Sequence, residues 1–175
     1  TYPRTRALIG EDAFHEIAEQ HLADPARMRL PHAQIGIGFA NRLTGPAFDL
    51  ATTEWAWLNA HGAADADPFD LATITGLTAQ CVASATVMRH PAARLVARTD
   101  PTPFDWNGVI MDSPLILLTR PYADVCMTGA GQSVAALLNL LDRPSPFASL
   151  LEIDNAAATL LVTAGALALY PGIML

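Results

Sequence analysis

Two short apolar runs separated by three residues lie in the second half of the chain: PLILLT at 114–119 and ADVCMT at 123–128. Runs of this length that are rich in Leu, Ile, Val and Thr and are bounded by turn residues are typical of a β-hairpin. Arg120-Pro121-Tyr122 supplies the turn, and Gly129-Ala130-Gly131 ends the second strand. The chain therefore contains β-structure, whatever its other segments form.

The first half has apolar residues at helical spacing. Phe14, Ile17, Ala18 and Leu22 share one helical face, and Glu11 and Asp12 lie in the first turn, where the helix dipole favours acids. Further helices are predicted over 32–43 and 48–61, and a short one starts at Asp67-Pro68-Phe69-Asp70 and ends at Gly76. Residues 1–78 are thus expected to form a helical bundle.

The pattern changes after about residue 79. Cys81–Met88 is predicted to be a strand, and the prolines of 99–105 indicate a loop. The hairpin follows, and helices are predicted over 133–141, 147–151 and 155–169. Strands followed by helices are the order of a small winged-helix-like module. We therefore predict an α+β protein with a helical domain at 1–78 and a winged-helix-like domain at 79–175.

The charge balance is acidic. The chain has seventeen acidic residues and ten basic ones, all Arg, for a net charge of −7. Nucleic-acid binding is not expected as the main activity, because it requires a surplus of cations. Two cysteines without a CxxC motif fit a reducing, cytoplasmic compartment. The uncharged run at 156–170 has 15 residues, whereas a membrane span needs about 20, so a buried helix is expected there.

No catalytic motif stands out. There is no GxSxG elbow and no phosphate-binding glycine loop, and Cys81 and Cys126 are expected to be inert strand residues. His61 with Asp65, Asp67 and Asp70 is the best metal candidate, but Asp67 and Asp70 fit helix capping better. The other histidines are predicted on the surface or on helix faces: His15, His21, His32 and His90. Glu54, among tryptophans, must either face the solvent or find a partner, and a structural ion pair with an Arg is expected.

Four segments together resemble the HvfC/BufC family of bacterial proteins, which carries an older label as a DNA-binding domain. They are TYPRTRALIGEDAFHEIAEQHL at 1–22, ATTEWAWLNAHGAADADPFDL at 51–71, VMRHPAARLVARTDPTPFDW at 87–106 and ILLTRPYADVCMTGAGQSVAALLNLL at 116–141. The resemblance extends over nearly the whole chain in the family's order, as spread patterns and not as one diagnostic motif. Family members usually have a further segment before the motif at Tyr2-Pro3.

The resemblance implies a non-catalytic, MbnC-like accessory subunit. Its expected partners are a TIM-barrel multinuclear iron enzyme and the leader of a ribosomally made precursor peptide whose cysteines the enzyme modifies, in several cases into copper-binding groups. The iron belongs to the partner, so this chain is expected to hold no metal or other cofactor. In that picture the accessory subunit binds the leader as an added strand.

The hairpin at 114–128 suggests where such a peptide could bind, because an open strand edge is a template for an extended peptide. The alternative, an ordinary wing packed on 133–141, is equally compatible with the pattern. Candidate peptide-contacting residues are the strand positions Leu115, Leu117, Thr119, Val125 and Met127. Trp106 and Tyr122 are candidate contacts for the enzyme, since aromatic residues are enriched at interface hot spots.

Two other functions remain open from the sequence. One is DNA binding by the second half, in which Arg89, Arg94 and Arg98 would form a local basic patch. The other is an enzyme in its own right with a metal at His61 and the neighbouring carboxylates.

Overall fold

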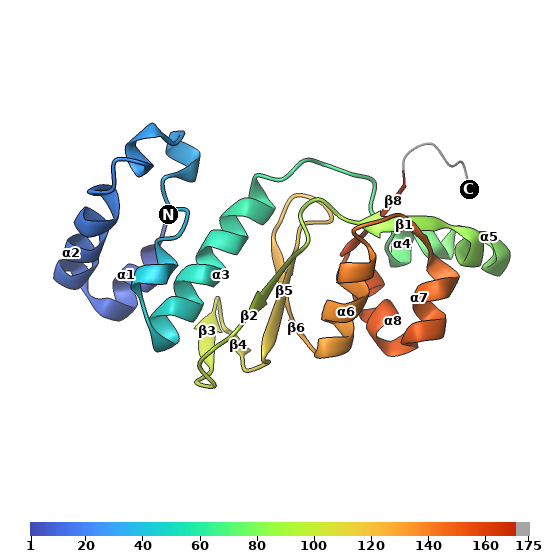
Figure 1. The fold of residues 1–175 in the computed structure, drawn as a ribbon. Coiled ribbons are helices and arrows are strands. Elements are labelled where there is room, and N and C mark those ends of the chain that lie inside the picture. Colours follow the sequence, from blue (N-terminus) through green and yellow to red (C-terminus); the bar gives the residue numbers. More distant parts are fainter. Residues whose placement is uncertain (171–175) are drawn as a thin grey trace.

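A computed structural model describes residues 1–170 (Figure 1). The protein is α+β, as predicted. Its elements follow the chain in this order: α1 Pro3–Ile9, α2 Glu11–Leu22, the short 3₁₀ helices η1 Arg27–Arg29, η2 His32–Gln34 and η3 Ala40–Arg42, α3 Gly45–His61, α4 Leu71–Thr75, α5 Ala79–Ser84, β1 Thr86–Arg89, β2 Arg94–Ala97, β3 Phe104–Trp106, β4 Val109–Met111, β5 Leu115–Thr119, β6 Cys126–Ala130, α6 Gln132–Leu140, β7 Ser145–Pro146, α7 Phe147–Ile153, α8 Asn155–Thr163 and β8 Leu167–Leu169.

A three-stranded antiparallel sheet forms the centre of the molecule, with strand order β2-β5-β6. Its register pairs Leu117 of β5 with Leu95 of β2 and with Thr128 of β6. All five residues of β5 are buried, because β5 is the middle strand and both of its faces are covered. The hairpin expected from the sequence is therefore present as β5–β6, and β6 extends through Ala130.

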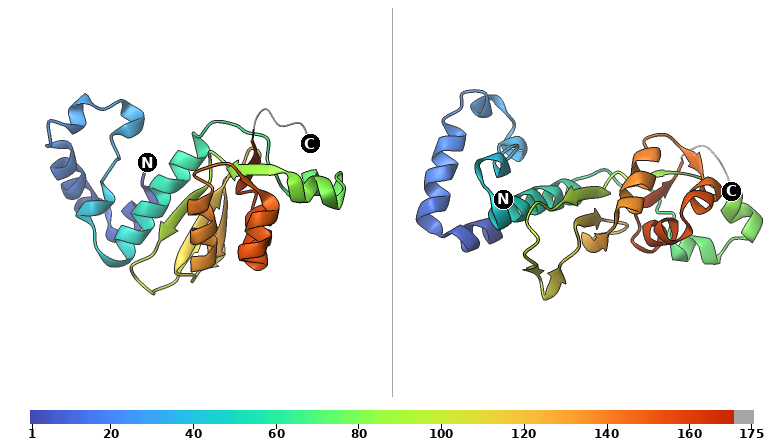
Figure 2. Two further views of the ribbon diagram at one scale, coloured as in Figure 1. Left: turned by 45° about the vertical axis from the view of Figure 1, so that its right-hand side comes forward. Right: turned by 60° about the horizontal axis from the view of Figure 1, so that its bottom comes forward.

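Alternate residues of β5 enter two different cores. Ile116 and Leu118 pack with Leu50 and Ala60 of α3 on one face. Leu115 and Leu117 pack on the other face with the C-terminal helices, including Leu137. Helix α3, from the first half of the chain, thus packs on the central sheet, which the second half forms (Figures 1 and 2). The contacts therefore join the two domains that were predicted to divide at residue 78.

A second small sheet, in the order β7-β1-β8, lies beyond the central sheet beside helices α4 to α8. Its edge strand β8 is covered by residues 67–69, whose backbone bonds to Leu167 and Leu169. At the opposite end of the molecule, α1, α2 and the start of α3 enclose a core around Tyr2, Phe39 and Ala51 (Figure 2). A two-stranded hairpin, β3–β4, turns at Asn107-Gly108, both with positive φ, and contributes Trp106 and Met111 to the α3 core.

Three of the predicted elements differ in the structure. Residues 32–43 form two 3₁₀ turns and not one helix. Residues 79–84 form helix α5, with Thr78 as the cap that accepts from Cys81 N, so only the end of the predicted strand is β-structure. The last predicted helix ends at Thr163, and β8 follows after Gly165. The apolar run at 156–170 is thus helix and then strand, and within residues 1–170 no helix is long and apolar enough to cross a membrane.

Candidate functional site

The outer edge of β6 is the feature of the central sheet that is open to a further strand. The strand order places β5 between β2 and β6, so among residues 1–170 β6 has a partner strand on one side only. Cys126 is exposed and Met127, Thr128 and Gly129 are half-buried.

The register shows which backbone groups point outward. Arg98 N–H donates to Pro114 O at 2.9 Å, which makes these opposed residues a hydrogen-bonded pair that continues the β2–β5 ladder. In an antiparallel ladder such pairs alternate along the strand, so Ile116 and Leu118 bond toward β2, and Leu117 and Thr119 bond toward β6. On β6, Cys126 and Thr128 consequently bond to β5. The N–H and C=O groups of Met127 and Gly129 face outward.

This edge lacks the devices that usually prevent strand addition. Charged side chains and proline protect edge strands from further pairing. From Val125 to Ser133 the chain has neither. The other edge strand, β2, is flanked by Arg94 and Arg98. The β6 edge therefore offers uncharged backbone to an incoming extended chain.

The five residues predicted to contact a peptide separate into two groups. Leu115, Leu117 and Thr119 lie on the middle strand and are at most 5% exposed, so an added strand cannot touch their side chains or their paired backbone. For these three the prediction is wrong. Val125 directly precedes β6 and Met127 is its second residue; both are half-buried against the α3 core and lie beside any strand added to β6.

The two residues predicted to contact the enzyme also differ from each other in their exposure. Trp106 is 8% exposed and Arg4 covers its ring, with the guanidinium carbon 4.2 Å from the ring centroid, so Trp106 is a core residue and not a free anchor. Tyr122 is 62% exposed, and its hydroxyl donates a hydrogen bond to the Asp70 carboxylate. Burial alone would raise the pKa of Asp70, but the hydrogen bonds from Tyr122 and Thr73 outweigh it and hold that pKa below its ordinary value.

The candidate metal residues do not converge. His61 stacks on Trp57, with ring centroids 5.2 Å apart, Asp65 pairs with Arg120, and Asp70 caps α4. Within residues 1–170, no group of three or more His, Cys, Asp and Glu side chains is arranged to hold a metal ion.

Several buried polar residues have partners that the sequence did not predict. Glu54, 4% exposed, accepts from Arg4 N–H, Thr5 N–H and the Thr5 hydroxyl, so main-chain donors of α1 and a hydroxyl replace the expected arginine ion pair. His21 lies on helix α2, within the expectation, but is buried there, whereas His90 is buried and lies neither on the surface nor on a helix. Of the cysteines, Cys81 lies on helix α5 and Cys126 is exposed on β6, so neither is a buried strand residue.

The three arginines of the proposed DNA patch are engaged with main-chain carbonyls. Arg89 and Arg94 donate to Ala93 O, and Arg98 donates to Met111 O, Ser113 O and Asp100 O. Their role in this fold is to hold loops, and these donors are not free for phosphate.

No protein-family model matches the chain, and no curated protein matches it significantly.

Proposed function

We propose that this protein is a non-catalytic accessory subunit that holds an extended peptide along the outer edge of β6 and presents it to a partner enzyme. The partner is a TIM-barrel multinuclear iron enzyme, and the peptide is the leader of a ribosomally made precursor. The complex works in the cytoplasm, where the precursor's cysteines are available in reduced form.

The observation that carries the proposal is the unpaired, uncharged backbone of β6. Strand addition needs outward N–H and C=O groups in register, and the ladder geometry places those of Met127 and Gly129 on this edge. The main chain then supplies affinity, and the side chains beside it supply specificity. Val125 and Met127 provide an apolar surface next to the first residues of the added strand.

The family resemblance of the sequence supports the choice of partner. Its quoted segments contribute to the fold from α1 to α6, and it associates proteins of this pattern with iron-dependent peptide modification. The iron sites of such an enzyme lie in the partner chain, so this subunit needs only to bind and to orient.

Met127→Pro tests the role of the edge. Because the Met127 N–H faces outward, proline removes a donor to the added strand and leaves the β5–β6 ladder intact. We expect leader affinity to fall about tenfold or more. The matched control is Met127→Leu, which also removes the thioether but keeps the N–H and should bind normally.

The measurement is a tagged pull-down from the native host at moderate salt, with mass spectrometry and iron analysis of the eluate. Wild type and Met127→Leu should bring down the iron enzyme in near-equal amount together with precursor peptide, whereas Met127→Pro should retain the enzyme and lose the peptide. Equal peptide recovery with the folded proline variant would refute strand addition at β6. Recovery of nucleic acid without an iron enzyme would refute the accessory-subunit function.

A further inference from the structure

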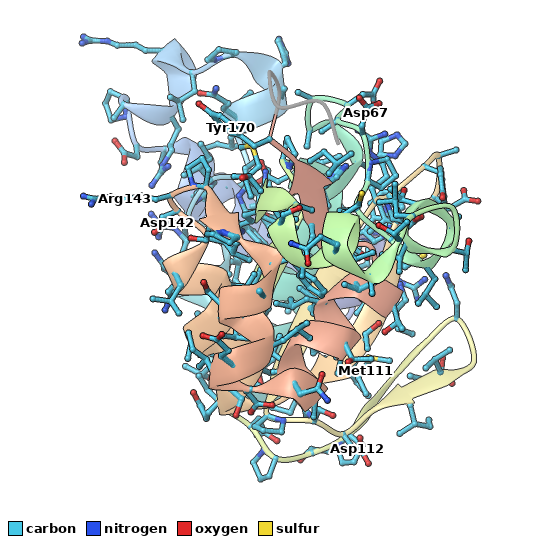
Figure 3. All side chains as sticks on the ribbon, turned by 90° about the vertical axis from the view of Figure 1, so that its right-hand side faces the viewer. Asp67, Met111, Asp112, Asp142, Arg143 and Tyr170 are labelled. Carbon is cyan, nitrogen blue, oxygen red and sulfur yellow. The ribbon has the colours of Figure 1, made fainter. Side chains whose placement is uncertain are left out.

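A second feature is a cavity of about 260 Å³ at the N-terminal end of the molecule, between α2 and the loop that holds η2. Helix α3 separates it from the central sheet, since Leu58 of α3 lines the cavity whereas Leu50 packs on the sheet. Figure 1 shows these N-terminal elements at one end of the molecule, and in Figure 3 they lie, in blue, behind the elements that carry Asp142, Arg143 and Tyr170. The cavity is therefore distinct from the β6 edge.

The wall of this cavity is largely aromatic. The ring centroid of Phe39 lies 4.6 Å from that of Tyr2, 5.3 Å from that of Phe14 and 5.6 Å from that of His21, and all four residues line the cavity. Aromatic rings favour neighbours at about 4.5 to 7 Å in offset or edge-to-face arrangements. Apolar cavities of about 150 Å³ hold benzene, so this one has room for a substituted benzene ring.

His21 adds a hydrogen-bond acceptor to this wall. The residue is 3% exposed, and its Nε2 lies 2.9 Å from Ile35 O. A carbonyl oxygen only accepts, so the ring proton is on Nε2, and in the neutral ring Nδ1 is an acceptor.

The Nδ1 atom of His21 is unpaired and open to the cavity. Among the residues and side chains that the structure describes, no donor bonds to it. The described nitrogens that are unpaired and also sealed from solvent belong to His90 and Arg98. His21 Nδ1 is not one of them, so it keeps access to solvent, and the cavity is the space that this ring lines.

The other polar side chains of the wall are engaged or solvated. The Tyr2 hydroxyl donates to Gly36 O at 2.6 Å, and His32 is exposed. A ligand that fills the cavity removes His21 Nδ1 from water. A donor on the ligand replaces the lost hydrogen bond, whereas an apolar ligand leaves a buried acceptor unpaired at a cost in free energy.

We propose that this cavity binds a phenol, with its ring against Phe14 and Phe39 and its hydroxyl donating to His21 Nδ1. Tyr2 shows that the cluster suits this chemistry, because its own ring stacks on Phe39 while its hydroxyl donates to a neighbouring acceptor. The phenol is a free small molecule or the side chain of a tyrosine in a peptide, and the probes below distinguish these sources. The site does not rest on the function proposed above.

The experiment is an NMR titration of the ¹⁵N-labelled full chain with p-cresol and with p-xylene, in which a methyl group replaces the hydroxyl. We expect p-cresol to shift the His21 Nδ1 resonance saturably, as a new hydrogen bond to that nitrogen requires, and p-xylene to leave it near its free position. In His21→Phe the preference for p-cresol over p-xylene should fall about tenfold relative to the wild type. Comparing preferences removes the difference in hydrophobicity between the probes, because that difference is the same for both proteins.

Three further variants locate the site. Ala18 lines the cavity on α2, so Ala18→Leu fills part of it and should weaken both probes about tenfold or more. Ala13→Leu is the matched control, because Ala13 is exposed on the same helix outside the lining and its replacement should bind like the wild type. His32→Gln replaces the exposed histidine of the wall and should keep the preference for p-cresol.

N-acetyl-tyrosine amide binding as tightly as p-cresol would assign the phenol to a peptide side chain, and its exclusion would assign it to a free small molecule. No saturable shift with either compound would overturn the proposal, as would equal binding by Ala18→Leu and Ala13→Leu. An unchanged preference in folded His21→Phe, or its loss in His32→Gln, would refute the assignment to His21. If His21→Phe does not fold, a wild-type Nδ1 resonance that p-cresol leaves unshifted refutes it as well.

The β6 edge provides the last comparison. Met127→Pro should bind p-cresol normally, since this cavity lies on the other side of α3. Loss of peptide binding at β6 and loss of the phenol site are therefore separate results.

Discussion

At the scale of the residue, the buried polar groups serve the backbone. Glu54 caps α1, Asp49 accepts from Thr99 N–H and Asp100 N–H, and Arg120 binds the carbonyls that end α3. The sequence indicates that Glu54 needs a partner, but it cannot identify backbone donors fifty positions away. For Arg120 the sequence does carry a signal. An arginine directly after the apolar run LILLT needs polar partners unless its side chain turns toward water.

His90 gives a prediction for the effect of pH on stability. Its pKa in the folded state is below the ordinary value of about 6.5, so the unfolded chain binds more protons when the pH falls below that value. The free energy of unfolding should therefore be constant above about pH 6.5 and fall below it. The slope from this residue is at most about 1.4 kcal/mol per pH unit, the limit for one proton.

Urea unfolding of wild type and His90→Gln between pH 4.5 and 7.5 measures this slope, and the variant should lose it. His32→Gln, at an exposed histidine, is the control and should keep it. Asp70, Asp100 and Asp154 have lowered pKa values, so their contribution is lost only near and below about pH 4. A slope that persists in His90→Gln would show that another group causes it.

At the scale of the element, the secondary structure of short segments depends more on tertiary contacts than on the local sequence pattern. The run at 156–170 has helical composition, yet Gly165, with φ of +66°, ends the helical course and lets residues 167–169 pair with β1. The hairpin at 114–128 was predictable because both strands and their turn are adjacent in sequence. The strand that keeps a free edge could not be predicted, because this depends on the pairing of β5 with β2, which lies about twenty residues earlier in the chain.

Gly165→Ala tests that turn. A Cβ there would lie 2.5 Å from Pro121 Cβ, and the positive φ is unfavourable for alanine by about 1 to 2 kcal/mol. We expect a loss of about 2 kcal/mol or more in the free energy of unfolding. Gly131→Ala is the matched control, since no atom lies within 4 Å of its Cβ position and its φ is −105°. Equal stability of the two variants in denaturant unfolding would contradict the contact with Pro121.

At the scale of the whole molecule, α3 joins the two halves. Leu50 and Ala60 share a core with Ile116, Leu118 and Val96, so the division predicted at residue 78 passes through a packed layer. Removing α3 would expose that face of the sheet. The winged-helix-like character of residues 79–175 stays a prediction.

This packing predicts that the chain unfolds in one cooperative step. Fluorescence of Trp55, Trp57 and Trp106 reports the α3 side, whereas circular dichroism also reports α6 to α8. The two urea curves should coincide. The variant Leu50→Ala should shift both midpoints together, with a loss of about 2 to 4 kcal/mol. Two separated transitions would instead mean that the halves unfold independently.

The open edge of β6 also affects how the protein behaves at high concentration. An unprotected strand can pair with the same strand of another copy, and such pairing grows with concentration. Without bound peptide, concentrated stocks are therefore expected to associate edge to edge and lose solubility. If the proposed peptide binds this edge, an excess of it in storage would act as a protectant against this association.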